Sequence, residues 1–366
     1  MRLLRRLLAG NLVPLLFLVV SVAGIYAADL RVSRISTDVL ERFFRNLFIV
    51  LSLIVPIVAG LGLNFGIVLG AMAGQIGLIV VQNGRVEGIF GITVAVACSI
   101  PIALVLGYLT GLLFNRTRGR EMITGIILGF FANGIYQFLF LILAGPVFPL
   151  HSKDVLLPQG MGLRVTMNLT TVERGLDDLL TVRIKTESAP PPDAPPDARP
   201  RNVYWGEIPF VTLAINVLLC FLIVWFLKTK LGQDLRAVGQ SPHVAEVAGI
   251  NVNRCRIIAT CVSIVLAGVG QIIFLQNMAV MNTFQSHEQV GFYAIAALLV
   301  GGATVSRVTI WNAVVGTLLF HTLIVVVSLA GQQLMDSPQI GEYLREFFAY
   351  AIIGATIAIH AWRTKA

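Results

Sequence analysis

The chain contains 366 residues, of which 56% are hydrophobic and only 13% are charged. This composition is far more apolar than a soluble domain of that length needs, so it excludes a soluble globular protein and predicts several passes through a membrane. The formal net charge is +8, but the lysines and arginines gather at the ends of apolar runs, which indicates cytoplasmic loops and argues against nucleic-acid binding. The four cysteines lack metal-ligand spacing, so we expect no metal site.

A helix needs about twenty apolar residues to cross the hydrocarbon layer of a bilayer. About ten runs meet this requirement, at residues 10–28, 43–62, 64–82, 89–114, 122–145, 208–228, 257–280, 288–306, 309–331 and 346–362. The sequence therefore predicts an all-α polytopic membrane protein with about ten transmembrane helices. The first run is long and lacks a convincing cleavage site, so we expect it to be a retained span.

The positions of the basic residues predict the topology. The N-terminal arginines and the loop NRTRGRE at residues 115–121 are placed in the cytoplasm by the positive-inside rule, and the alternation of spans then places both termini and residues 229–256 there too. Residues 29–45 would lie outside although they carry four arginines among acidic residues, so we expect a short amphipathic surface helix in that segment.

The chain divides into a first transmembrane half (residues 1–145, spans 1–5), an external insertion (146–206) and a second half (207–366, spans 6–10). The insertion contains APPPDAPPDARP at residues 189–200, where prolines disfavour helix and strand pairing, and alternating residues at 161–185 that predict a small β-hairpin. The third and eighth spans are both rich in glycine and alanine and are expected to break in mid-span. Such a pair indicates two pseudo-symmetric halves around a central pathway, with close helix packing as the alternative.

No serine, histidine and carboxylate are grouped as a catalytic site requires, and no Asp or Glu lies deep in a predicted span, so we expect neither an enzyme nor a proton relay. The spans instead carry uncharged amides, which both donate and accept hydrogen bonds and suit polyhydroxylated or heterocyclic solutes. For any single amide, hydrogen bonding between helices is the alternative interpretation. The predicted pathway residues are Asn64, Gln75, Asn133, Gln137, Gln271, Gln276 and Asn277.

The polar segment at residues 229–256 is expected to fold. Gly232 and Gly239 would bound a first helical turn; Ser241 is a favourable N-cap with Pro242 at the first helical position, and Gly249 would end this second helix. A short, well-capped helix on the cytoplasmic face indicates a docking site for another protein. The residues predicted to form it are Asp234, Arg236, Ser241, Pro242, His243, Glu246 and Gly249.

The run GQDLRAVGQSPHVAEVAGINVNR at residues 232–254 resembles the cytoplasmic coupling region of the permease subunits of bacterial ABC importers for monosaccharides, nucleosides and branched-chain amino acids. GLGLNFGIVLGAMAGQIG (60–77) and GFYAIAALLVGGATVSRVTIWNAVVGTLLF (291–320) resemble two further segments of that family. The resemblance implies a multi-pass subunit of the bacterial cytoplasmic (inner) membrane, in which residues 229–256, here called the coupling segment, contact an ATPase.

The same resemblance implies the partners of this chain: a second permease subunit in a homodimer or heterodimer, cytoplasmic ABC ATPase subunits, an external solute-binding protein and membrane lipid. This chain has no G-x-x-x-x-G-K-[ST] phosphate loop, so it is expected to bind no cofactor, and ATP and Mg would bind to the ATPase subunits. The expected solute is a simple sugar or a nucleoside, followed by a riboflavin-like vitamin or a branched-chain amino acid. The alternatives are a secondary transporter or facilitator that works without an ATPase, and a non-transport membrane scaffold.

Overall fold

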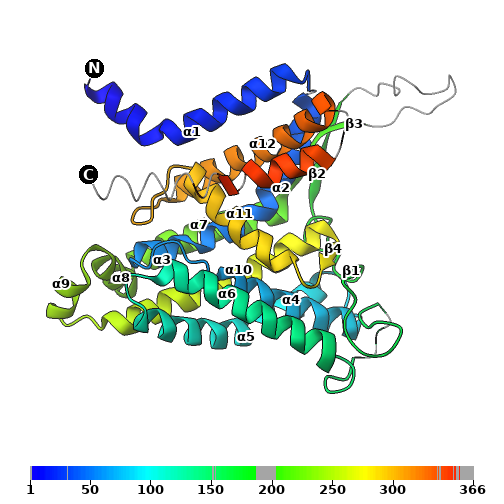
Figure 1. Cartoon of the computed structure of the whole chain (residues 1–366), viewed down its shortest axis with the longest axis horizontal. Coiled ribbons are helices and arrows are strands. Elements are labelled where there is room, and N and C mark those ends of the chain that lie inside the picture. The colour runs from blue at the N-terminus through cyan, green and yellow to red at the C-terminus, as the bar shows by residue number, and fades with distance from the viewer. Residues whose placement is uncertain are drawn as a thin grey trace.

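The computed structural model describes residues 2–30, 32–150, 152, 154–186, 203–335, 337, 339–348, 350–351 and 354. It is mostly helical, and its long helices run side by side (Figure 1). The elements of the first half are α1 (Arg2–Ala27), α2 (Val32–Ser52), α3 (Ile54–Val58), α4 (Ile67–Gly84), α5 (Gly88–Arg116), α6 (Glu121–Phe138) and the π-helical turn η1 (Leu139–Leu143).

The later elements are β1 (Thr166–Asn168), β2 (Thr181–Thr186), β3 (Val203–Pro209), α7 (Phe210–Lys228), α8 (Lys230–Gln240), α9 (Pro242–Val247), α10 (Val252–Met278), β4 (Val280–Asn282), α11 (Ser286–Val300) and α12 (Ile310–Met335). Residues 339–348 are also helical. The coupling segment, with α8 and α9, lies at one end of the helix bundle, and the strands lie at the opposite end (Figure 1).

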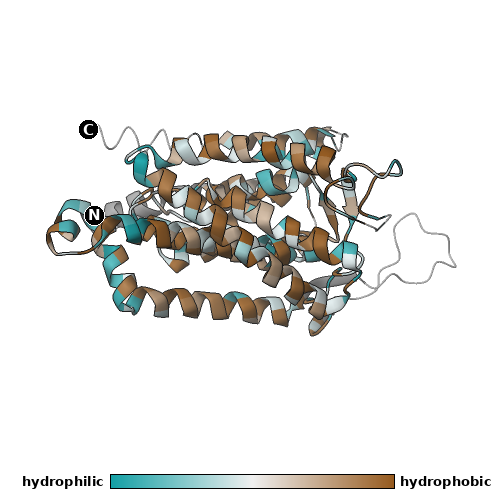
Figure 2. Cartoon of the chain, turned by 90° about the horizontal axis from the view of Figure 1, so that it is seen from below, coloured by the Kyte–Doolittle hydropathy of each residue, from teal (hydrophilic) through white to brown (hydrophobic). Residues whose placement is uncertain are grey.

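Among the described residues, six helices are long and apolar enough to cross a membrane: α4, α5, α6 continued by η1, α7, α10 and α12. Because the hydrocarbon layer offers no hydrogen-bond partners, apolar runs of this length satisfy their backbone groups as continuous helices. Hydrophobic residues cover the helices along their length (Figure 2). The multi-pass character is thus confirmed, whereas the total of about ten spans stays a prediction, because α1, α2, α11 and the last helix do not meet these criteria over the described residues.

The expected surface helix at residues 29–45 is not a separate element. It is the first part of α2, which continues without a break to Ser52. Ile35 and Val39 on this part are buried against Val325 and Val326 of α12. The prediction was wrong because the apolar face of the amphipathic segment packs against another helix and is therefore not available to the membrane surface.

The chain is interrupted at different places from those expected. α4 is continuous through the third predicted span, and the break precedes it, at residues 59–66. The second break follows α11, at residues 301–309. The two breaks touch, since a Cβ built on Gly62 would lie 3.0 Å from Cγ1 of Val305.

The glycines within α4 instead serve close packing. Side chains at Gly70 and Gly74 would overlap the carbonyl oxygens of Ile264 and Gly268, so the backbones of α4 and α10 lie in direct contact. For this part of the third span the structure supports the packing alternative.

The strands pair differently from the expected hairpin within residues 161–185. β1 is antiparallel to β4, with Thr166 opposite Asn282, and β2 is antiparallel to β3, with Thr181 opposite Pro209. Alternating side chains identify a strand but not its partner, and β4 presents its edge to β1 because it follows α10 at the same end of the bundle. The proline-rich residues 189–200 lie outside the described residues.

Candidate functional site

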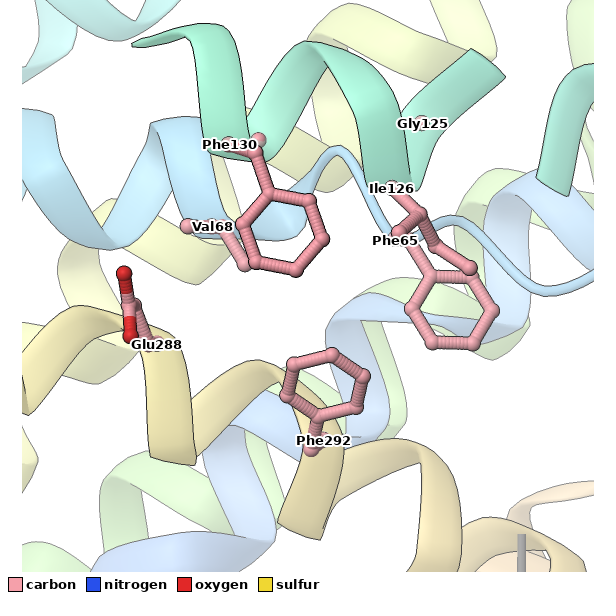
Figure 3. A pocket seen from close by; sticks show the side chains of 8 residues that line it. Phe65, Val68, Gly125, Ile126, Phe130, Glu288 and Phe292 are labelled. Atoms are coloured by element: carbon pink, nitrogen blue, oxygen red, sulfur yellow. The ribbon is translucent and has the colours of Figure 1, made fainter. Parts of the chain in front are cut away.

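A cleft opens between α4, α6 and α11 (Figure 3). It is open to the surroundings, and the cavity within it has a volume of about 20 Å³, roughly the space of one water molecule. Gly125 and Gly129 of α6 line one wall, and a Cβ on Gly125 would lie 3.3 Å from Cβ of Phe65. The lining residues are Phe65, Val68, Gly125, Ile126, Gly129, Phe130, Glu288 and Phe292.

The walls of the cleft combine aromatic rings with one carboxylate. The ring centroids of Phe65 and Phe292 are 5.8 Å apart, and Phe130 of α6 lies on the opposite wall (Figure 3). Glu288, in the first turn of α11, is half-buried and is the one charged residue among those lining the cleft. The lining of the cleft is therefore almost entirely apolar, with one carboxylate at its edge.

A polar network, here called the His287 cluster, connects the three helices beside the cleft. His287 is fully buried, and its Nδ1 and Nε2 lie 2.9 Å from Oε1 of Gln75 and 3.0 Å from Oδ1 of Asn133. The side-chain amide of Asn133 donates to Glu288, and Gln137 donates to Asn133 over 3.4 Å. Three of the predicted pathway amides thus meet around one histidine.

The His287 cluster has hydrogen-bonding capacity that the described residues do not use. Nε2 of Gln75, the hydroxyl of Tyr136 and Oε1 of Gln271 are all buried without a partner among them. The ring of Tyr136 packs 5.1 Å from that of His287, and Gln271 donates to the backbone oxygen of Ser286 over 3.5 Å. Buried polar groups are normally paired, and none of these three residues is among those that line the cleft.

The other three predicted pathway amides lie elsewhere. Asn64 holds the break before α4: its amide donates to Oγ of Ser263 over 3.1 Å, and its oxygen accepts from the amide of Gly66 at 2.9 Å. Gln276 and Asn277 both donate to Oδ2 of Asp177, at 3.0 and 2.9 Å. The structure does not bring these three residues to the cleft.

Sequence reasoning missed His287, Glu288, Phe65 and Phe292. His287 precedes the apolar run at residues 288–306 and Glu288 is its first residue, so both read as part of the polar connection before a span. One feature of the sequence could have identified them. No lysine or arginine occurs between residues 257 and 306, whereas the loops that flank other spans contain such residues.

The coupling segment folds into two helices with the expected capping at α9. Oγ of Ser241 accepts from the amide of Val244 at 3.4 Å, Pro242 occupies the first turn, and Gly249 follows with φ +82°. The boundaries of α8 differ from the prediction. Thr229, not Gly232, separates it from α7, because the Thr229 side chain caps α8.

Gly239 also does not end α8, which continues to Gln240. Instead it allows a close backbone contact: a Cβ on Gly239 would overlap the carbonyl oxygen of Val58, and one on Gly60 would lie 2.9 Å from Cα of Gly239. Leu235 and Val238 of α8 are buried on the same side. α8 therefore rests directly on the break at residues 59–66, and Phe65 at the end of that break lines the cleft.

α9 presents an exposed surface. Val244 and Val247 are 64% and 78% exposed, and His243 and Glu246 are exposed beside them. On α8, Arg236 is exposed and Asp234 is half-buried. An exposed apolar pair between charged residues is typical of a protein-binding surface.

The end of the coupling segment is fixed to the loop at residues 115–121. Arg256 and Glu121 form a buried ion pair at 2.5 Å, and Arg256 also donates to Oδ1 of Asn115 at 2.9 Å. Arg118 donates to Oδ1 of Asn253 over 2.6 Å. These contacts anchor one side of the coupling segment, while α9 is held by the buried Ala245 and exposes its other face.

Comparison with known proteins identifies the family. Residues 36–357 match the profile described as the permease component of branched-chain amino acid transport systems. The chain belongs to this permease family.

The permease is also similar to individual relatives over shorter stretches. It is 37% identical over 93 residues to a nucleoside ABC transporter permease protein of Lactococcus lactis, a match that covers 25% of each chain. A guanosine ABC transporter permease protein of Bacillus subtilis is 31% identical over 102 residues, 27% of this chain and 31% of the relative. A xylose transport system permease protein of Haemophilus influenzae is 25% identical over 163 residues, 44% of this chain and 40% of the relative.

The matches thus span between a quarter and two fifths of these relatives' lengths. No solved structure matches the permease.

Proposed function

We propose that the permease is the membrane subunit of an ATP-driven importer and forms the path of a small polar solute. The observation that carries this proposal is the contact between Gly239 of α8 and the backbone of the break at residues 59–66. That break leads directly into the cleft at Phe65. A protein that binds α9 and moves α8 would therefore act on one wall of a solute site.

The charge distribution supports an orientation. The turns at the end of the bundle that carries α8 and α9 hold Arg116, Arg118, Arg120, Lys228, Lys230, Arg254 and Arg307. By the positive-inside rule this end faces the cytoplasm of a bacterial inner membrane. α1 begins at the same end (Figure 1). Ten crossings follow if α1, α2, α11 and the last helix complete the six apolar ones.

The solute is proposed to be a nucleoside or a simple sugar, because relatives are named for nucleosides and for xylose. The carboxylate of Glu288 at the cleft, with the amide of Asn133 bound to it, is consistent with a polar solute. The proposed complex contains a second permease subunit, cytoplasmic ATPase subunits that hold ATP and Mg, and an external solute-binding protein. Binding of ATP would shift the permease between inward-open and outward-open states through different contacts with α9.

The test reverses two exposed charges of the coupling segment, Arg236→Glu with Glu246→Arg. We expect the ATPase subunit to be lost on co-purification and solute uptake by cells to fall more than tenfold. The matched control reverses two exposed charges at the other end of the bundle, Arg85→Glu with Glu173→Arg, and should retain the ATPase. Uptake that persists without any ATPase subunit would instead establish a secondary transporter or facilitator.

A further inference from the structure

We propose that the buried ion pair between Arg256 of α10 and Glu121 of α6 is a positioning pair, which transmits movement of the coupling segment to α6 and, through α6, to the His287 cluster. The inference rests on the proposed function. It adds a second connection from the coupling segment into the bundle, beside the contact of Gly239 with the break at residues 59–66. Neither residue of the pair lines the cleft, so each acts through the helix that carries it.

The first argument is that Arg256 is firmly connected to α9. The backbone amide of Ile250, just after α9, donates to the carbonyl oxygen of Ala245 within it over 2.9 Å. α10 then begins at Val252, and Arg256 is its fifth residue. Ala245 and Val252 are both buried in the same hydrophobic cluster. A displacement of α9 would therefore reach Arg256 through hydrogen-bonded backbone and packed side chains.

The second argument is the way Arg256 holds the start of α6. Its Nη2 lies 2.5 Å from Oε1 of Glu121, the first residue of α6, and also donates to the backbone oxygen of Phe114 over 3.0 Å. Its Nε donates to Oδ1 of Asn115 at 2.9 Å. Hydrogen bonds between ionised groups are short and directional. The guanidinium group therefore fixes the first turn of α6 relative to α10.

The third argument is that stability alone does not explain the pair. The side chains of Arg256 and Glu121 are only 6% and 11% exposed. A buried ion pair is often no more stabilising than apolar residues of similar volume, because the loss of hydration offsets the attraction. The pair Arg345–Glu342 is similarly short, at 2.6 Å, but joins residues three apart in one helix. Arg256 and Glu121 are 135 residues apart and join two helices.

The fourth argument is that α6 has few other attachments. It is one continuous helix, and its buried residues are Gly125, Gly129 and Tyr136. Its polar side-chain ties to other helices, among the described residues, are Glu121 to Arg256 at one end and Asn133 to Glu288 and His287 further along. Rigid helices joined by hydrogen bonds can carry coupling between distant sites. The position of α6 thus depends on both ties, and a shift at the first would move the second.

The experiment measures the movement of α6 in the purified complex of the permease with its ATPase subunits, before and after trapping with ATP, Mg and vanadate. Spin labels are attached through Ile127→Cys of α6 and Leu318→Cys of α12, two exposed positions, in a chain whose native cysteines are replaced by alanine. Double electron–electron resonance gives the distance between the labels. In the wild type this distance should change on trapping.

Glu121→Gln should reduce that change in distance to less than half, because the amide no longer attracts the guanidinium group. ATP hydrolysis by this variant should stay within twofold of the wild type, since the exposed surface of α9 is untouched. A role in folding alone would not separate the two measurements.

Two further variants complete the test. Arg256→Lys keeps a cation opposite Glu121, so the permease should fold and assemble, but it loses the planar fork that also binds Asn115 and Phe114. Its change in distance should lie between those of the wild type and Glu121→Gln. Glu342→Gln is the matched control, because it alters an ion pair within one helix, and it should behave as the wild type.

Three results would overturn the inference: a full change in distance in both Glu121→Gln and Arg256→Lys, an equal loss in Glu342→Gln, or a wild-type complex that hydrolyses ATP without moving α6. Each of these leaves the proposed function intact, because the ATPase still works with the permease. A permease that never assembles with an ATPase contradicts both.

Discussion

Two polar clusters in this permease are built from the same kinds of side chain and differ in how completely their hydrogen bonds are used. In the Asp177 cluster both carboxylate oxygens of Asp177 accept, from Thr212 at 2.6 Å and from Gln276 and Asn277. Arg45 donates to Asn277 and lies over the ring of Phe274. In the His287 cluster Gln75, Tyr136 and Gln271 each retain an unpaired buried atom, whereas in the Asp177 cluster Nε of Arg45 is the one such atom among the described residues.

This difference in hydrogen bonding distinguishes two roles of amide side chains in the two clusters. The Asp177 cluster joins α2, α7 and α10 to the segment before β2, so its amides stabilise the fold. The His287 cluster lies beside a cleft and keeps donors and acceptors unused. The number of partners that an amide has in the fold, rather than its presence in a span, distinguishes helix-joining from ligand-binding residues.

The largest expected effect comes from removing the centre of the saturated cluster. Asp177→Ala leaves three buried donors without their acceptor, and hydrogen bonds to charged groups contribute about 1.5–3 kcal/mol each, so we expect stability to fall by about 3 kcal/mol or more. Thermal unfolding in detergent, followed by dye labelling of the native cysteines, measures it. Asp178→Ala is the control, because that side chain is 62% exposed.

A matched pair of glutamines tests the comparison directly. Gln276→Met should lower stability by about 2 kcal/mol, since it removes the bonds to Asp177 and to the amide of Leu176. Gln75→Met should change stability by less than about 1 kcal/mol while reducing solute uptake, because it loses one bond and also removes an unpaired amide nitrogen. Equal unfolding temperatures for the two variants would contradict the distinction.

Disturbing the contact between α8 and the break at residues 59–66 should alter the cleft and leave the Asp177 cluster intact. Gly239→Ala forces the added methyl group against the backbone of Val58, an overpacking that costs about 1–3 kcal/mol. We expect solute uptake to fall while ATPase binding persists, measured by co-purification and uptake in parallel. Gly134→Ala, a helical position with open space around it, is the control and should behave as the wild type.

The smallest effect is expected at the cap of α9. Ser241→Ala removes the acceptor for the amide of Val244, and loss of such a cap costs about 1 kcal/mol locally. Both clusters should remain intact, so the unfolding temperature of the variant should be unchanged. A titration should show a several-fold weaker affinity of the variant for the ATPase subunit. A drop in unfolding temperature comparable to that of Asp177→Ala would show that α9 belongs to the stable core.

Structural features that depend on local sequence were predicted well. The apolar runs located the six confirmed candidate spans, and the Ser-Pro pair located the start of α9. These features depend on residues close together in the chain.

Features that depend on distant partners were not predictable. Alternation at residues 161–185 indicated strands, but their partners lie at residues 203–209 and 280–282. Gly239 read as a helix end because its neighbour across the bundle, the backbone at Val58, is not visible in the sequence. His287 acquires its significance only when α4 and α6 bring Gln75 and Asn133 to it.

The pairing of β1 with β4 connects the strands on the outward side of the proposed importer to the first turn of α11, at the edge of the proposed solute site. Asn282 of β4 lies opposite Thr166. The backbone amide of Asn282 donates to Oγ of Ser286, the first residue of α11. Glu288 follows two residues later. A displacement of β1 would thus be transmitted through Asn282 and Ser286 to the first turn of α11, so the strands and the edge of the cleft are mechanically connected.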